Sequence, residues 1–412
     1  MIKVTVVIPV YNVEAYLPAC LDSVLGQSLE EIEIICIDDA SPDRCGAILD
    51  EYAEKDKRVK VIHLPENHKQ GYGRNRGEEA ALGKYIYFLD SDDMITGTAL
   101  EEMYEIAEAD KLDGIIFDSQ VLYESEELRK KHHLAYPPKR SGHYEDAVMT
   151  GSDLLDAFVA QKEWNVYVQR QFWRREYLQE NDIYSTEGIE HEDEIFSFKA
   201  MLLAERMRYV PKDWFIRRYR EGSVMTRGYT DDDFHGYFIC FREMIDFAEK
   251  YGKKSDGALE NIYHMYERML ALYPQFSAQE DPLSWFRTEE EKRAYRFFAY
   301  EQDLNDHYRS SINKMNRLVP LDTKIWIYGA GAIGVRVCRR FLRDGNQVRG
   351  FLVTNISGNS EKLFGLPVIE QAQADIGEDE LVIVAVNNKL KPEICSLLEK
   401  RGVKYAEYPT WR

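Results

Sequence analysis

The chain has 412 residues, of which 44% are hydrophobic and 12% aromatic, enough for two or three domains with packed cores. This composition excludes an intrinsically disordered protein. The formal net charge of −19 argues against a general nucleic-acid binder and against broad attraction to anionic membranes, because both need basic surface.

The cysteine pattern and the hydropathy indicate the compartment. None of the six cysteines lies in a Cys-x-x-Cys pair, and most have apolar neighbours, which is typical of reduced core residues. The first nine residues run into a predicted strand and lack a signal-peptide cleavage site. The sequence contains no run of about 18 apolar residues, so no transmembrane segment is predicted. We therefore expect a cytoplasmic protein, with peripheral association at the inner face of the membrane left open.

The first 90 residues alternate between two periodicities. Apolar, β-branched or aromatic runs predict strands at 3–9, 32–37, 59–64 and 85–89, and a helical pattern follows each of the first three. Each strand–helix unit is about 30 residues long, which is the signature of a mostly parallel sheet built from βαβ units.

Two of these strands end in neighbouring carboxylates, Asp38-Asp39 and Asp92-Asp93. Parallel strands end at one edge of a sheet, where ligands bind in open α/β folds. Carboxylates suit Mg²⁺ or Mn²⁺, ions that usually bind one or two carboxylates plus substrate phosphates. The alternative for the second pair is a turn that caps the helix expected after Thr98. Arg74 and Arg76 could meet phosphate at a helix start or lie on a solvated helix face.

Four segments of this region resemble the motifs of family 2 glycosyltransferases of GT-A fold, in order and in spacing. They are Val6-Val7-Ile8-Pro9-Val10-Tyr11-Asn12, Ile37-Asp38-Asp39-Ala40-Ser41-Pro42-Asp43, Arg74-Asn75-Arg76-Gly77, and the segment 83–93, which ends in Asp90-Ser91-Asp92-Asp93. The resemblance covers the first ~100 residues. It implies a nucleotide-diphospho-sugar donor, with UDP the commonest nucleotide, and an inverting transfer.

The resemblance also implies roles for single residues. Asp39 would contact the nucleotide base, and the Asp-x-Asp motif would bind Mn²⁺ or Mg²⁺ through Asp92 and Asp93. Ala40 stands where the family usually has glycine, so we expect an altered turn there. The implied nucleotide-sugar-binding residues are Pro9, Tyr11, Asp39, Arg74, Asp92, Arg218 and Arg220.

A second acidic group lies further along the chain, in His191-Glu192-Asp193-Glu194. One interpretation is that these acids interact favourably with the dipole of a helix that begins here. The segment also resembles the His-Glu-Asp-Glu segment of the same family, which implies that Asp193 is the general base and that Glu192 supports it. An inverting transfer needs a carboxylate to take the proton of the acceptor hydroxyl. Whether His191 contacts the metal or the acceptor stays open.

Residues 218–224 resemble the family's closing motif, with Arg217 in place of the usual tyrosine, and a loop here could fold over the donor and exclude water. Apolar residues at helical spacing predict three or four helices over 231–318, with breaks near 252–257 and at Pro274. Their aromatic stripe is typical of helix packing, with a lipid- or partner-facing surface as the alternative.

The last 90 residues predict a separate Rossmann-like domain. Strand 324–328 leads into a glycine fingerprint, Gly329, Gly331 and Gly334, at the start of a helix, which is the context of a dinucleotide site. The next strand ends in Thr354-Asn355 instead of an acid for the ribose, which weakens the NAD interpretation. A C-terminal nucleotide site at these three glycines and a packing module without a ligand both remain open.

The sequence thus predicts an α/β chain with a GT-A domain (1–228), a helical segment (229–320) and a small Rossmann-like domain (321–412). The function expected is a metal-dependent inverting glycosyltransferase that moves a sugar, UDP-linked by preference, to a glycan or lipid-linked acceptor in surface polysaccharide synthesis. The alternatives are a dinucleotide-dependent sugar oxidoreductase and a non-catalytic sugar-nucleotide binding protein. The sequence leaves the sugar, the acceptor and the oligomeric state open.

Overall fold

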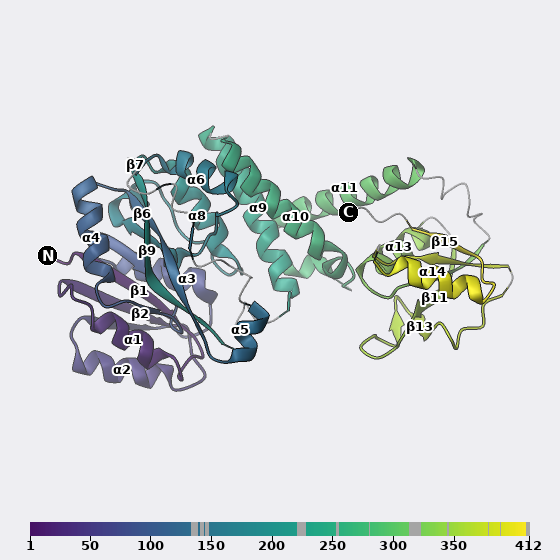
Figure 1. The fold of residues 1–412 in the computed structure, drawn as a ribbon, viewed down its shortest axis with the longest axis horizontal. Coiled ribbons are helices and arrows are strands. Elements are labelled where there is room, and N and C mark those ends of the chain that lie inside the picture. The colour runs from purple at the N-terminus through teal and green to yellow at the C-terminus, as the bar shows by residue number, and fades with distance from the viewer. Residues whose placement is uncertain are drawn as a thin grey trace. The chain divides into compact units, whose positions relative to one another are not determined.

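The computed structural model describes the chain except for residues 133–138, 141–143, 145–147, 221–227, 253–254, 280, 313–322, 344–345, 378, 388 and 409–412. The chain forms two compact units, Met1–Met269 and Leu270–Arg412, which are described separately (Figure 1). The division into three parts at residues 228 and 320 stays a prediction.

The first unit is built on a mixed sheet with the strand order β3-β2-β1-β4-β8-β6-β9-β5, and β7 pairs with β9. The βαβ prediction is confirmed, because β1 to β4 run parallel to one another. β8 joins this part to β6 by antiparallel pairing on both sides. The strands are β1 (Val4–Val10), β2 (Ile32–Asp38), β3 (Val59–His63), β4 (Tyr85–Phe88), β5 (Met94–Ile95), β6 (Gly114–Tyr123), β7 (Val148–Met149), β8 (Gln171–Arg174) and β9 (Met207–Tyr219).

Helices cover both faces of this sheet, as expected for strands that are buried along their whole length. The helices are α1 (Leu17–Leu25), α2 (Cys45–Lys55), α3 (Lys69–Ala80), α4 (Ala99–Asp110), α5 (Glu126–His132), α6 (Gly151–Ala160), the 3₁₀ turn η1 (Val168–Arg170), α7 (Arg175–Glu180), α8 (Glu192–Leu203), α9 (Asp231–Tyr251) and α10 (Asp256–Phe276).

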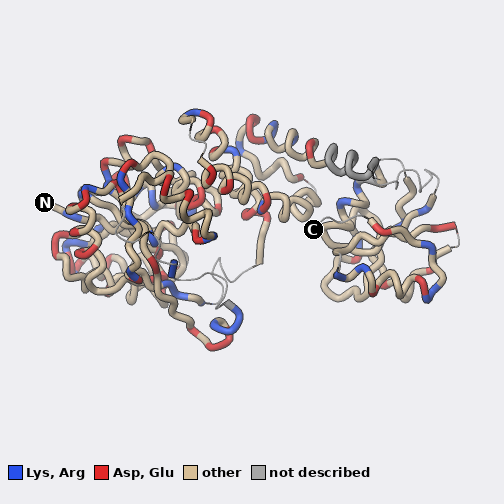
Figure 2. Tube along the Cα trace, turned by 45° about the horizontal axis from the view of Figure 1, so that its top comes forward, with Lys and Arg blue, Asp and Glu red and all other residues tan. Residues whose placement is uncertain are grey.

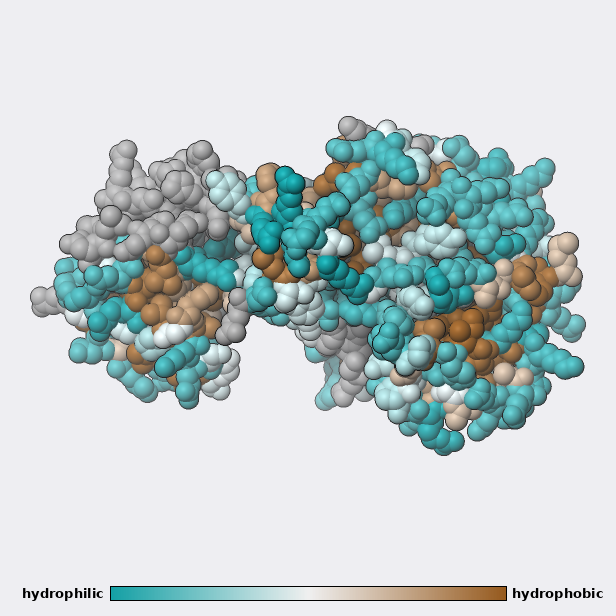
Figure 3. Space-filling view, turned by 180° about the vertical axis from the view of Figure 1, so that it is seen from behind, coloured by the Kyte–Doolittle hydropathy of each residue, from teal (hydrophilic) through white to brown (hydrophobic). Residues whose placement is uncertain are grey.

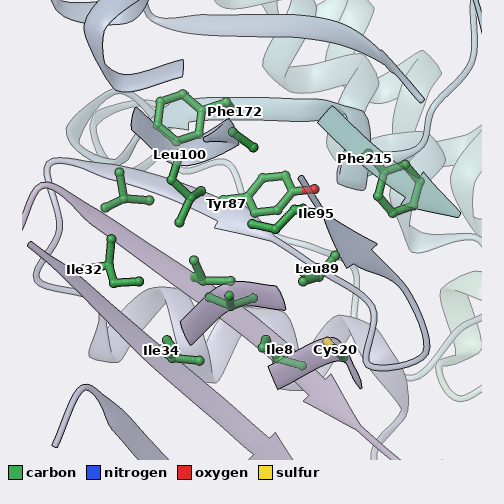
Figure 4. Packing of buried hydrophobic residues seen from close by; sticks show 14 of the residues in the cluster. Ile8, Cys20, Ile32, Ile34, Tyr87, Leu89, Ile95, Leu100, Phe172 and Phe215 are labelled. Carbon is green, nitrogen blue, oxygen red and sulfur yellow. The ribbon is translucent and has the colours of Figure 1, made fainter. Parts of the chain in front are cut away.

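The core on one face of the sheet joins β1 and β2 to α1, α2 and α4. Alternate residues of the strands, such as Ile8 and Ile34, point into this core, to which Cys20 of α1 and Leu100 of α4 also belong (Figure 4). The residues between them point to the other face, where Gly77 of α3 lies against Val7. The carboxyl ends of β1, β2 and β4 therefore stand on a sheet that is fixed from both sides.

The helical segment differs from the prediction at one point. α9 and α10 are separated near residue 252 as expected, but Pro274 does not break α10, which continues to Phe276. Pro274 lies in the last turn, so it interrupts the helix only where the helix ends. Part of the aromatic stripe packs internally, as in the pairs Tyr273–Phe298 and Phe286–Tyr295, which supports the packing interpretation for these residues.

The second unit contains η2 (Pro282–Trp285), α11 (Glu289–Ile312) and a sheet of order β12-β13-β11-β10-β14-β15. β10, β11, β13, β14 and β15 are parallel, and β12 is antiparallel to β13, which confirms a Rossmann-like arrangement. Its elements are β10 (Lys324–Tyr328), α13 (Ala332–Arg343), β11 (Gln347–Val353), β12 (Lys362–Leu363), β13 (Leu366–Glu370), β14 (Glu380–Val384), α14 (Lys391–Lys400) and β15 (Tyr405–Glu407).

The visible surface is mostly hydrophilic (Figure 3), and positive and negative residues are interspersed along the chain (Figure 2). Among the described residues, no helix combines the length and the apolar character that crossing a membrane requires.

Candidate active site

The carboxyl ends of β1, β2 and β4 meet at one edge of the sheet. Val10 is in register with Asp38, and the backbone N–H of Asp39 donates to the carbonyl of Val10 at 2.9 Å. The N–H of Leu89 donates to the carbonyl of Val7 at 3.0 Å, which places Asp90 beside the end of β1. The two acidic strand ends predicted from the sequence therefore lie on the same edge.

The two aspartates after β2 differ in their environment. Asp38 is bonded to His63 at 2.9 Å and to the backbone N–H of Ser41 at 3.0 Å, so it holds the turn. Asp39 is buried and accepts the backbone N–H of His68 at 2.8 Å, while burial raises the pKa of its carboxyl. Ala40 has a φ of 55°, in the left-handed region that favours glycine. Ala40 thus holds a backbone conformation that glycine adopts at lower cost, and the altered turn expected here stays a prediction.

The other residues implied to bind nucleotide lie around this edge. Pro9 is buried in β1, and a side chain at Gly73 of α3 would lie 3.2 Å from its Cβ. Tyr11 follows β1 and is 48% exposed, which leaves its ring accessible to a ligand.

Two arginines at the carboxyl end of β9 contact the loop after β4. The backbone N–H of Arg218 donates to Asp93 at 2.7 Å, and the Arg218 Nε donates to the carbonyl of Asp92 at 3.0 Å. The Arg220 Nε donates to the Asp92 carboxylate at 2.7 Å. The structure thus brings Arg218 and Arg220 to Asp92 and Asp93, which lie more than 120 positions earlier in the sequence. The remainder of the closing motif, 221–224, and with it the loop expected to cover the donor, lies outside the described residues.

The chemistry of this loop fits a divalent cation. Burial and the neighbouring Asp90 raise the pKa of Asp92, and burial together with Asp92 and Asp90 raises the pKa of Asp93. These carboxylates raise one another's pKa, which a bound cation would offset, and their oxygens are the hard donors that suit Mg²⁺ or Mn²⁺. Asp92 is the more accessible donor, because Asp93 is 6% exposed. Within the described part of the chain, His, Cys, Asp and Glu form no group of three that could hold a metal, so phosphate oxygens would have to complete the coordination.

Tyr16, which the sequence analysis did not single out, packs against this arginine pair. Its ring centroid lies 5.3 Å from the Arg218 guanidinium and 5.0 Å from that of Arg220. Arg217, which replaces the family's tyrosine, lies 4.3 Å from the ring of Tyr167 and 5.3 Å from that of Tyr219. Arginine therefore fills the tyrosine position by stacking on aromatic rings. Nothing in the sequence pattern pointed to these contacts.

Arg74 lies between the two acidic groups. It is 2% exposed, donates to Asp90 at 3.0 Å, and forms a short ion pair with Glu192 of α8. Burial opposes its charge, but Glu192, Asp90 and Asp193 outweigh that effect and raise the pKa of the guanidinium. Two of its nitrogens are engaged by carboxylates, so its position suits a link between the loop after β4 and α8.

The first turn of α8 carries the second acidic group. Asp193 is partly exposed, and burial together with Glu192 and Glu194 raises the pKa of its carboxyl to about 7. His191, which precedes the helix with a φ of 65°, bonds to Asp233 at 2.8 Å and stacks on Tyr237 at 4.0 Å. Burial would lower the pKa of His191, but the bond to Asp233 outweighs it and raises that pKa. A carboxyl that titrates near pH 7 can act as a base at neutral pH.

The glycine fingerprint of the second unit has a structural explanation at two of its positions. Gly329 has a φ of 114°, and a side chain there would lie 2.7 Å from the carbonyl of Ala385. A side chain at Gly334 would collide with the carbonyl of Gly329, whereas one at Gly331 would point into open space. Packing accounts for Gly329 and Gly334, and a nucleotide site in this unit stays a prediction.

Comparison with known proteins agrees with this geometry. Residues 5–180 match the family described as Glycosyl transferase family 2. The crystal structure of S. aureus TarS 1–349 in complex with UDP-GlcNAc covers 68% of this chain and 76% of that chain, with a TM-score of 0.51 and 22% identity. That likeness shows the fold, and the first unit is accordingly a GT-A domain.

Two curated bacterial proteins are also similar. The chain is 32% identical over 224 residues to the uncharacterized glycosyltransferase EpsJ of Bacillus subtilis, which covers 54% of this chain and 62% of EpsJ. It is 29% identical over 275 residues to the glycosyltransferase GlyA of Streptococcus pneumoniae, which covers 66% of this chain and 37% of GlyA. The chain thus spans less than two thirds of either relative. Residues 5–180, somewhat less than half of the chain, are thus similar to the family 2 glycosyltransferases.

Proposed function

We propose that the protein transfers a sugar from a nucleotide-diphospho-sugar to a hydroxyl of a glycan or lipid-linked acceptor, with inversion, in the synthesis of a surface polysaccharide. The observation that carries the proposal is the pair of acidic groups at one sheet edge, Asp92-Asp93 and Asp193, which Arg74 links through Asp90 and Glu192. UDP is the nucleotide we favour, since TarS was crystallised with UDP-GlcNAc.

In this proposal the donor binds along the edge formed by β1, β2 and the loop after β4. Asp39 faces the base, Pro9 and Tyr11 line the nucleotide, and Arg218 and Arg220 lie at the diphosphate. Asp92 and Asp93 would hold Mn²⁺ or Mg²⁺, and the ion would supply positive charge to offset the charge that develops on the leaving diphosphate. Arg74 positions the loop after β4 relative to α8.

The reaction we propose is a single in-line displacement. Asp193 takes the proton of the acceptor hydroxyl as its oxygen forms a bond to the anomeric carbon. The bond from that carbon to the diphosphate oxygen breaks in the same step, and the nucleoside diphosphate leaves on the opposite face. The pKa of Asp193, about 7, leaves a large fraction of the carboxylate ionised at neutral pH.

The test is donor hydrolysis, in which water replaces the acceptor. UDP-, GDP-, CDP- and dTDP-sugars are offered with Mn²⁺ to the full chain, and release of nucleoside diphosphate is measured. We expect turnover of one donor, loss of about 100-fold or more in Asp92→Asn and Asp193→Asn, and no change in Glu105→Gln, an exposed carboxylate on α4. Equal turnover in all four proteins would overturn the proposal.

A further inference from the structure

Three members of the His191–Glu194 segment are held by side chains from three different helices. Asp193 is the fourth member, and part of its surface remains accessible. The three pairs are His191 with Asp233 of α9, Glu192 with Arg74 of α3, and Glu194 with Arg268 of α10. Two of these helices lie beyond residue 180, where the family match ends.

Arg268 reaches the segment at two points. It forms a short ion pair with Glu194, whose side chain is 6% exposed, while the Arg268 side chain is 46% exposed. Its guanidinium also lies 5.3 Å from the ring centroid of Tyr237, and Tyr237 stacks on His191 at 4.0 Å with an interplanar angle of 8°. Arg268 therefore contacts Glu194 directly, and it reaches His191 through the ring of Tyr237.

The charges around Asp193 explain why this contact matters for the base. Glu192 and Glu194 raise the pKa of Asp193, whereas Arg74 and His191 lower it. Arg268 balances the charge of Glu194. Among the described residues, Glu194 forms an ion pair with no other cation. Two titratable groups of α9 also lie near Asp193: burial and acidic neighbours, Asp193 among them, raise the pKa of Tyr237 and of Cys240.

We propose that Arg268 is a positioning residue of the glycosyltransferase site, which acts on Asp193 through Glu194. α10 then completes the active site instead of serving only as a packed helix or a spacer. This inference rests on the proposed function, because it takes Asp193 as the base. Removing the cation would leave Glu194 buried beside Asp193 without a partner, which is the costly case for a buried ion pair.

The experiment measures kcat and KM for hydrolysis of UDP-N-acetylglucosamine, or of the sugar nucleotide hydrolysed fastest in the donor screen, from pH 5.5 to 9. In Arg268→Gln we expect the acid limb of kcat to move upward by about one pH unit, so that kcat falls about fivefold to tenfold at pH 6.5 and little at pH 9. The donor KM stays unchanged, because Asp92 and Arg220 are not altered.

Two companion variants separate charge from structure. Arg268→Lys keeps a cation and returns the limb toward its original position. The double variant Glu194→Gln/Arg268→Gln removes both charges and does the same. Glu260→Gln, on the exposed part of the same helix, is the matched control and leaves the profile unchanged. Thermal unfolding of each variant shows whether the first unit is folded.

Two results overturn the inference: an unchanged profile in Arg268→Gln, or a loss that is equal at every pH and is not restored by Arg268→Lys. Asp193→Asn, run alongside, keeps this outcome distinct from failure of the proposed function. An active Asp193→Asn protein means that Asp193 is not the base. An inactive one beside a normal Arg268→Gln profile overturns the role of Arg268 alone.

Discussion

At the scale of single residues, the site depends on carboxylates that differ in their partners. Asp38 and Glu192 are bound to cationic or polar side chains and serve to hold elements together. The Asp193 side chain forms no hydrogen bond or ion pair within the described part of the chain, and Glu192 and Glu194 make its surroundings acidic. The same residue type therefore fixes a turn in one place and, in the proposed function, accepts a proton in another, because burial and neighbouring charge differ between the two places.

The pH dependence of turnover follows from Asp193. Its pKa is raised to about 7, and a general base must be deprotonated, so kcat should rise with pH through about 7 and level off above it. The measurement is kcat for donor hydrolysis between pH 5 and 9. A profile that is flat between pH 6 and 8 would contradict the assignment of Asp193.

A second buried acid, Glu78 of α3, affects stability. It is 1% exposed, its Oε1 has no hydrogen-bond partner among the described residues, and burial raises its pKa to about 8. Because the folded pKa lies above the unfolded value, the contribution of Glu78 to stability is complete below the unfolded pKa, at acid pH, and is lost as the pH rises toward 8.

We therefore expect Glu78→Gln to raise the free energy of unfolding of the first unit by about 2 kcal/mol at pH 8 and by much less at pH 5. Urea unfolding at both pH values measures the difference. Glu105→Gln, an exposed acid, should show no such dependence on pH. A difference that is the same at pH 5 and at pH 8 would rule out titration of Glu78 as the cause.

At the scale of elements, α3 shows how a short motif combines packing with a site. Arg74 faces the two acidic groups, while Asn75 binds the backbone of Ser185 through both its amide donor and its carbonyl. Gly77, the last residue of the motif, lies against β1, where an added Cβ would be 2.2 Å from Val7 Cγ1. The glycine lets the helix approach the strand closely, and this approach places Arg74 at the strand ends.

Replacing Gly77 by alanine tests this account. Helix propensity alone favours alanine by about 1 kcal/mol, but overpacking against Val7 costs more. We expect Gly77→Ala to lower the free energy of unfolding by about 2 kcal/mol and to reduce donor turnover. Gly331→Ala, where an added Cβ meets open space, is the control. A Gly77→Ala protein that is more stable than the original would show that the approach is not tight.

At the scale of the whole molecule, each of the two units has its own core. Ile383 of β14 is fully buried within the core of the second unit. Units with separate cores often unfold in separate transitions. A substitution in one core should therefore leave the chemistry in the other intact.

We expect Ile383→Ala to lower the stability of the second unit by about 3 kcal/mol. Donor turnover should stay unchanged, also across the temperatures at which the second unit unfolds. Differential scanning calorimetry and the hydrolysis assay measure the two effects. If turnover falls in parallel with the lower transition, the second unit takes part in catalysis or in holding the first unit together.

Much of the fold could be predicted because it depends on local patterns. The strands β1 to β4 follow from apolar runs, and the parallel order of these strands follows from their spacing. The break predicted at Pro274 was wrong because a proline in the last turn of a helix disrupts few helical hydrogen bonds. The residue at which α10 ends depends on the tertiary contacts of the helix. The resemblance pointed to Asp92, Asp193 and Arg220 because motifs keep their order along the chain, whereas Asp233 and Arg268 belong to no local pattern.

The sequence by itself determined the family resemblance, the alternation of strands and helices, and the aspartates at the strand ends. Hydrophobic periodicity and motif spacing can be read from residues that are close together in the sequence. Only the tertiary structure decided which charges meet. Arg74 and Glu192 are 118 positions apart, and Glu194 and Arg268 are 74 apart. Burial and pairing set whether an acid is a structural partner or a proton acceptor, and both arise only when distant segments pack together.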